Sequence, residues 1–102
     1  MAAPATVARR IDASLRDLEA EVSFLPQLAA YWPEESETAQ VSYMLEWDEL
    51  MDRLRGLERD YRSGQMTSEQ AERYRALLRK LEEALPIIER LGLTRPPVTL
   101  QP

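Results

Sequence analysis

Apolar residues recur along the first segment at intervals of three and four, which is the spacing of one face of an α-helix. The members of this stripe are Val7, Ile11, Leu15, Leu18, Val22 and Leu25. The stripe predicts a helix over about residues 5–25. Pro26 is expected to end it, because proline lacks a backbone donor and disfavours a helical conformation in the preceding residue. One or two further turns beyond a kink stay open as an alternative.

The strongest pattern lies between residues 43 and 91 and predicts two helices folded back on each other. The first covers about residues 38–63, and its heptad stripe consists of Tyr43, Trp47, Leu50, Leu54, Leu57 and Tyr61. The second covers about residues 67–91, and its wider stripe consists of Ala71, Tyr74, Leu77, Leu78, Leu81, Ala84, Leu85, Ile88 and Leu91. Gly64 can adopt a left-handed conformation, and Thr67 with Gln70 forms a capping box, so a tight antiparallel turn is expected.

These elements predict an all-α fold in one domain over residues 1–102: a long antiparallel helical hairpin with the N-terminal helix packed on it as a three-helix bundle. The width of the last stripe indicates two neighbouring helices, and it also allows a homodimer in which two hairpins form a four-helix core. Residues 94–102 contain three prolines and predict an extended tail. This tail could dock on a partner or lie on its own bundle through Val98 and Leu100, and the sequence leaves both possibilities open.

Composition excludes several classes of chemistry. The chain has no cysteine and no histidine, which removes disulfides, thiol nucleophiles, Cys/His zinc sites and a histidine general base. The formal net charge of -5 disfavours a nucleic-acid partner. That charge would permit an acidic antitoxin or a nucleic-acid mimic. Arginines, however, are expected to interleave the acidic residues on all three helices, which leaves no unbroken acidic face.

Location and cofactors are predicted from what the sequence lacks. The arginines near the N-terminus are followed by no apolar signal-peptide core, and no stretch has the length of a membrane span. We therefore expect a cytoplasmic protein with no membrane partner. No phosphate-binding loop is present, and no catalytic residue or cofactor is predicted.

Carboxylates offer one candidate metal site. Glu46 with Glu49 and Glu69 with Glu72 form two Glu-x-x-Glu pairs on successive helices. They resemble the paired acidic motifs of MazG-type nucleotide pyrophosphohydrolases, which are all-helical and bind Mg²⁺, and the resemblance covers these residues only. It implies an alternative function as a Mg²⁺-dependent enzyme, which needs the four carboxylates within about 5 Å of one another. The turn near residue 65 instead separates the pairs by roughly 15 Å or more, so solvated helix faces are the ordinary interpretation.

Six apolar residues are candidates for binding a partner. They are Tyr31, Trp32, Met44, Met51, Val98 and Leu100. Aromatic residues in a connection are common anchors at interfaces, and methionines suit adaptable contact surfaces. The competing interpretation is structural: Trp32 closes the open end of the bundle, and the two methionines fill the core. With enzymatic chemistry largely excluded, the sequence favours a non-enzymatic module that binds a protein partner or associates with itself.

Overall fold

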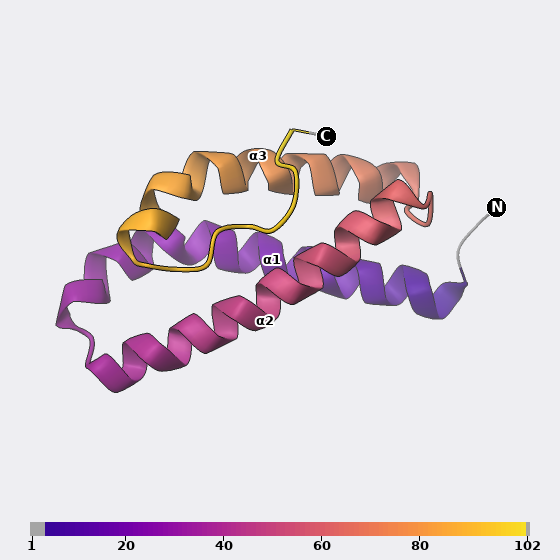
Figure 1. Ribbon diagram of the computed structural model, residues 1–102. Helices are drawn as coiled ribbons and strands as arrows, with labels where there is room; N and C mark the ends of the chain where they lie inside the picture. The colour runs from indigo at the N-terminus through magenta and orange to yellow at the C-terminus, as the bar shows by residue number, and fades with distance from the viewer. Residues whose placement is uncertain (1–3, 102) are drawn as a thin grey trace.

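A computed structural model describes residues 4–101 of the chain. It contains the helices α1 (Ala5–Tyr31), α2 (Glu37–Arg62) and α3 (Ser68–Arg90), with a short 3-10 helix, η1 (Trp32–Glu34), between α1 and α2. The three long helices pack around one hydrophobic core, so the prediction of an all-helical three-helix bundle is confirmed (Figure 1). Residues 1–3 of the predicted domain and residue 102 of the predicted tail lie outside the described residues.

Helix α1 is longer than predicted. It runs without interruption through Pro26 and ends at Tyr31, six residues beyond the expected end. The reason is tertiary packing, because Leu25 and Leu28 are both buried on the core side of the continued helix. Pro26 itself lies on the exposed face of α1, away from the core.

The turn between α2 and α3 follows the predicted signals closely. Gly64 has φ of 75°, and the amide of Gln65 donates to the Asp60 carbonyl at 2.9 Å, which closes α2 with a Schellman motif. The Thr67 hydroxyl accepts from the backbone amide of Gln70, and the side-chain oxygen of Gln70 accepts from the backbone amide of Thr67. The predicted capping box is therefore present. A second Schellman motif ends α3 at Gly92, which has φ of 72°.

Alanine at Gly64 is expected to lower the free energy of unfolding by about 1 kcal/mol, because a Cβ atom is strained at positive φ even where it meets no neighbour. The same substitution at Gly56 serves as the control. Gly56 lies inside α2, and an added Cβ would meet only Arg59 at an ordinary 3.8 Å, so stability should rise by up to about 1 kcal/mol. Urea unfolding of both variants measures the difference. Equal effects of the same sign would contradict the left-handed requirement at Gly64.

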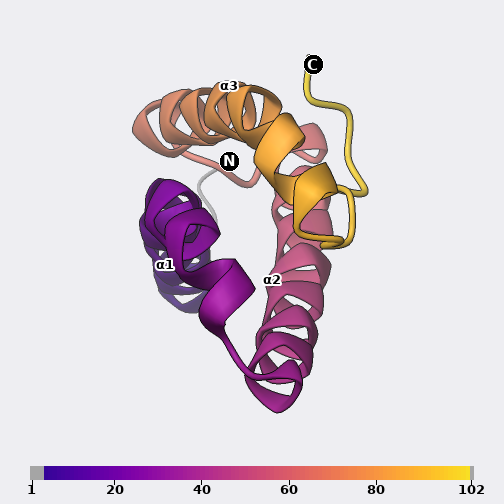
Figure 2. The ribbon, with the colours of Figure 1, turned by 90° about the vertical axis from the view of Figure 1, so that its left-hand side faces the viewer.

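The three helices do not pack equally. Helix α3 makes its most extensive contact with α1 and a smaller one with α2. Helices α2 and α3 lie closest to each other near their shared turn (Figure 1). From that turn α2 crosses the bundle obliquely, and its first half projects beside α1 and away from α3 (Figures 1 and 2). The hairpin that dominates the sequence pattern is therefore an open one, and the N-terminal helix supplies most of the cover for α3.

The C-terminal tail runs along the outer side of α2 and α3 (Figures 1 and 2). The Trp47 indole donates to the Thr94 carbonyl at 2.7 Å, and the Thr99 amide donates to Glu58 at 3.1 Å. Val98 and Leu100 pack against the hydrophobic core and are partly buried. Of the two possibilities that the sequence left open, the structure has the tail docked on its own bundle.

Ion pairs tie α1 to each of its neighbours. Arg10 makes a two-pronged bond to Asp60 of α2, at 2.9 and 3.2 Å, and this bond raises the pKa of Arg10 above its ordinary value. Arg73 of α3 reaches Glu19 at 2.8 Å, and the bond to Glu19 raises the pKa of Arg73. Asp60 is the buried member of the first pair, so this bond also orients α1 along α2.

Candidate functional site

The six predicted partner-binding residues have different environments. Met51 is 2% exposed and belongs to the core, and Met44, Val98 and Leu100 pack against that core and are partly buried. Trp32 is also partly buried and meets the Tyr43 ring edge-on, with 6.0 Å between ring centroids. Tyr31, by contrast, is 58% exposed. Most of the set thus packs in or against the core, and Tyr31 is its most exposed member.

Four large hydrophobic side chains stay exposed on the two helix halves that meet at the junction of α1 and α2. These four residues, Phe24, Tyr31, Val41 and Leu45, are called here the α1–α2 corner. Among residues 4–101 these are the large hydrophobic side chains that stay exposed, and all of them lie in the second half of α1 or the first half of α2. Sequence reasoning missed three of the four. The available signal was their position off the apolar stripes, since a large apolar residue outside its stripe must face away from the core.

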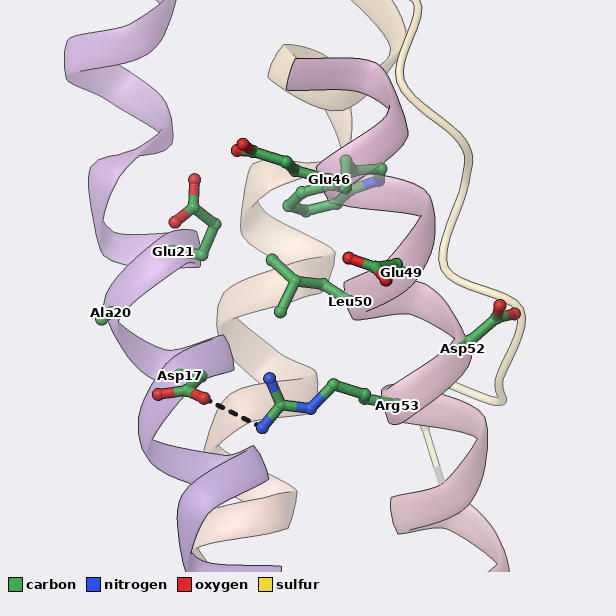
Figure 3. Close-up of a pocket in the computed structure, with 9 residues that line it drawn as sticks. Asp17, Ala20, Glu21, Glu46, Glu49, Leu50, Asp52 and Arg53 are labelled. Carbon is green, nitrogen blue, oxygen red and sulfur yellow. Dashed lines mark hydrogen bonds and ion pairs between the residues drawn. The ribbon is translucent and has the colours of Figure 1, made fainter. Parts of the chain in front are cut away.

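An open groove of about 780 Å³ lies next to this corner, between α1 and α2, and α3 lies behind it in Figure 3. Helix α1 contributes three of its lining residues and α2 contributes six. They are Asp17, Ala20, Glu21, Glu46, Trp47, Glu49, Leu50, Asp52 and Arg53. Apolar Ala20, Leu50 and Trp47 thus share the groove with five carboxylates and one guanidinium.

Hydrogen bonds hold both walls of the groove. Arg53 of α2 donates to Asp17 of α1 at 2.9 Å and closes one end of it (Figure 3). Nearer the corner, the Tyr43 hydroxyl donates to Glu21 at 2.5 Å. Burial and the bond to Glu21 raise the pKa of Tyr43, so this hydroxyl stays a neutral donor. Among the lining residues that the structure describes, Arg53 is the one cation, and its charge is already paired with the Asp17 carboxylate.

The charge pattern around the groove corrects a sequence expectation. Between Arg16 and Arg53 the chain contains ten acidic residues and no lysine or arginine. The interpretation that arginines interleave the acidic residues on all three helices is therefore wrong for this stretch, which includes the corner and most of the groove. The basic residues concentrate in the rest of the chain. The asymmetry is visible in the sequence when charges are counted over this whole segment, which joins the second half of α1 to the first half of α2.

The two Glu-x-x-Glu pairs are not brought together. Glu46 and Glu49 line the groove between α1 and α2, whereas Glu69 and Glu72 line a separate hollow on α3 beside three arginines. All four side chains are exposed. No group of three or more acidic residues within residues 4–101 is placed to share a metal ion. The convergence that a Mg²⁺-dependent mechanism requires is absent from the described part of the chain.

Compared with known proteins, the chain matches no protein-family model, no curated protein and no solved structure. The geometry is therefore the basis for any functional inference. Within residues 4–101, no helix has the length and apolar character needed to cross a membrane.

Proposed function

We propose that the protein is a non-enzymatic, cytoplasmic interaction module that binds a protein partner through its α1–α2 corner. The observation that carries this proposal is that the exposed large hydrophobic side chains all lie on the two helix halves that meet at the α1–α2 junction. Exposed apolar residues scattered singly are ordinary, but a cluster of them marks an interaction surface. The lack of cysteine fits a reducing compartment.

The energetics support a binding role for this surface. Full burial of a large apolar side chain contributes about 1.5–3 kcal/mol, so an interface that covers several corner residues has the driving force for specific association. Nothing in the fold requires these side chains to be apolar, because the core is complete without them. Leu45, which is 63% exposed, is the clearest case.

Removal of apolar surface from the corner tests the proposal. The double substitution Phe24→Ser with Leu45→Ser is expected to abolish specific partner capture by the immobilised protein from a lysate of its own organism. Both residues are exposed, so the free energy of unfolding should change by less than about 1 kcal/mol.

Arg79→Ser with Lys80→Ser is the matched control, because it shortens two exposed side chains on α3, away from the corner. Captured proteins that are kept by this control and lost from the corner variant, as read by quantitative mass spectrometry, are the expected result. Capture that the corner variant retains in full, or no protein enriched over an empty support, contradicts the proposal. A mass measurement in solution distinguishes a foreign partner from a second copy of the chain.

A further inference from the structure

The groove between α1 and α2 differs from an ordinary helix–helix crevice in its chemistry. Its apolar lining residues are Leu50, Trp47 and, at the outer edge of α1, Ala20, and acidic side chains from both helices border it (Figure 3). We propose that the partner docks here as a basic amphipathic helix. Its apolar face would contact Leu50 and Ala20, and its lysines or arginines would meet the acidic walls. This inference rests on the proposed function and specifies the chemistry of its partner.

The shape of the site favours a helix. Helices α1 and α2 lie beside each other, and α3 covers one side of the pair while the groove opens on the other (Figures 2 and 3). A further helix on the open side would complete a four-helix arrangement, with its side chains filling the groove. The corner extends the same walls, because Phe24 lies one turn beyond Ala20 on α1 and Leu45 lies one turn before Glu49 on α2. A docked helix would therefore cover apolar surface beyond the groove as well.

The carboxylates around the groove indicate that the docking helix carries a positive charge. Glu46 and Glu49 form no ion pair within residues 4–101, and Glu21 is bonded to the neutral Tyr43 hydroxyl. An uncharged or acidic occupant would desolvate these carboxylates without compensating them, which is costly. A basic occupant gains from the same charges and is also attracted from a distance. A second copy that presents its own acidic groove is disfavoured by like-charge repulsion.

A synthetic peptide tests this chemistry directly. The probe is a helix of about 18 residues with leucine at the heptad core positions and lysine flanking them. Isothermal titration calorimetry should detect binding of this peptide to the intact protein. A scrambled peptide of the same composition, and a peptide with glutamate in place of lysine, should show none. The affinity should fall several-fold between about 50 and about 500 mM salt, because the carboxylates are exposed to screening.

Glu46→Gln with Glu49→Gln is the variant that removes the attraction without changing side-chain size. We expect it to weaken peptide binding about tenfold at low salt. Glu69→Gln with Glu72→Gln removes the same number of charges at the same spacing from the hollow on α3, and it should leave the affinity within about twofold.

Several results would overturn the inference: no binding of the basic peptide, equal binding of the scrambled peptide, or equal loss of affinity in the two Gln variants. A stable dimer that protects the amides around Glu46 and Glu49 from hydrogen exchange would assign the groove to a second copy instead. If the basic peptide fails while partner capture still depends on Phe24 and Leu45, the partner chemistry is wrong and the proposed function stands. If capture fails as well, both are wrong.

Discussion

Alanine in place of Trp47 is expected to lower the free energy of unfolding by about 3–5 kcal/mol, the largest effect of a single truncation in this bundle. Trp47 is fully buried in the half of α2 that leans away from α3, and its indole donates to the carbonyl of Thr94. The substitution therefore removes a large core side chain and the anchor of the C-terminal tail together. Urea unfolding followed by circular dichroism measures the first effect. Faster hydrogen exchange at the Thr99 amide reports the second, since that amide bonds to Glu58 only while the tail is docked.

The other tryptophan provides a matched control. Trp32 is partly buried at the rim of the core, so Trp32→Ala should cost only about 1–2 kcal/mol and leave exchange in the tail unchanged. Trp47→Phe separates packing from hydrogen bonding, because it keeps most of the ring volume and removes the donor. A loss below about 1 kcal/mol for Trp47→Ala would show that the core is not organised around this residue.

Gln70→Glu is expected to lower the free energy of unfolding by about 3 kcal/mol at neutral pH, although it changes one amide nitrogen to oxygen. Gln70 is buried between α1 and α3, where its side-chain nitrogen donates to the Ala8 carbonyl at 3.1 Å and to Asp12 at 2.8 Å. Its oxygen accepts from the Thr67 amide, and a glutamate keeps that bond. The substitution therefore preserves the capping box and places a carboxylate against two acceptors. Unfolding by urea at neutral pH measures the loss.

The pH dependence of this variant has a defined sign. Repulsion from the two acceptors raises the pKa of the introduced carboxyl in the folded state above its unfolded value of about 4.3. The protonated form of this carboxyl therefore favours the folded state. This contribution is fully present below the unfolded-state pKa and is lost as pH rises through the folded-state pKa. The difference from the natural chain should accordingly shrink near pH 4. Gln65→Glu, at an exposed position in the α2–α3 turn, should change stability by less than about 0.5 kcal/mol at either pH. Equal effects at positions 65 and 70 would contradict the interface role of Gln70.

Local signals account for the part of the fold that the sequence predicted correctly. The apolar stripes, Gly64, and the Thr67–Gln70 capping box act over one or two turns, and the two later helices begin and end within a residue of the expected positions. The end of α1 was missed because Leu28, buried by tertiary contacts, outweighs the local effect of Pro26. The stripe of α3 predicted two neighbours but could not specify which neighbour is the major one, because periodicity describes a face and not its partner.

Part of the candidate site could likewise be predicted from the sequence, and part of it could not. Exposure of Phe24, Val41 and Leu45 follows from their position off the apolar stripes, and the acidic stretch between Arg16 and Arg53 can be read from the residues alone. The groove could not be predicted, since it exists only through the placement of α1 against α2. The ion pair of Arg53 with Asp17 depends on that same placement.

The extensive contact between α1 and α3 has a consequence for how the molecule forms. The bond from Gln70 to Ala8 joins residues 62 apart, so the chief helix–helix interface has a high contact order for a helical protein. During synthesis, α1 emerges well before the helix that covers it, and its apolar stripe stays open until α3 has been translated. We therefore expect the bundle to fold more slowly than helical proteins of the same length whose contacts lie chiefly between consecutive helices, with α3 docking on α1 late in folding.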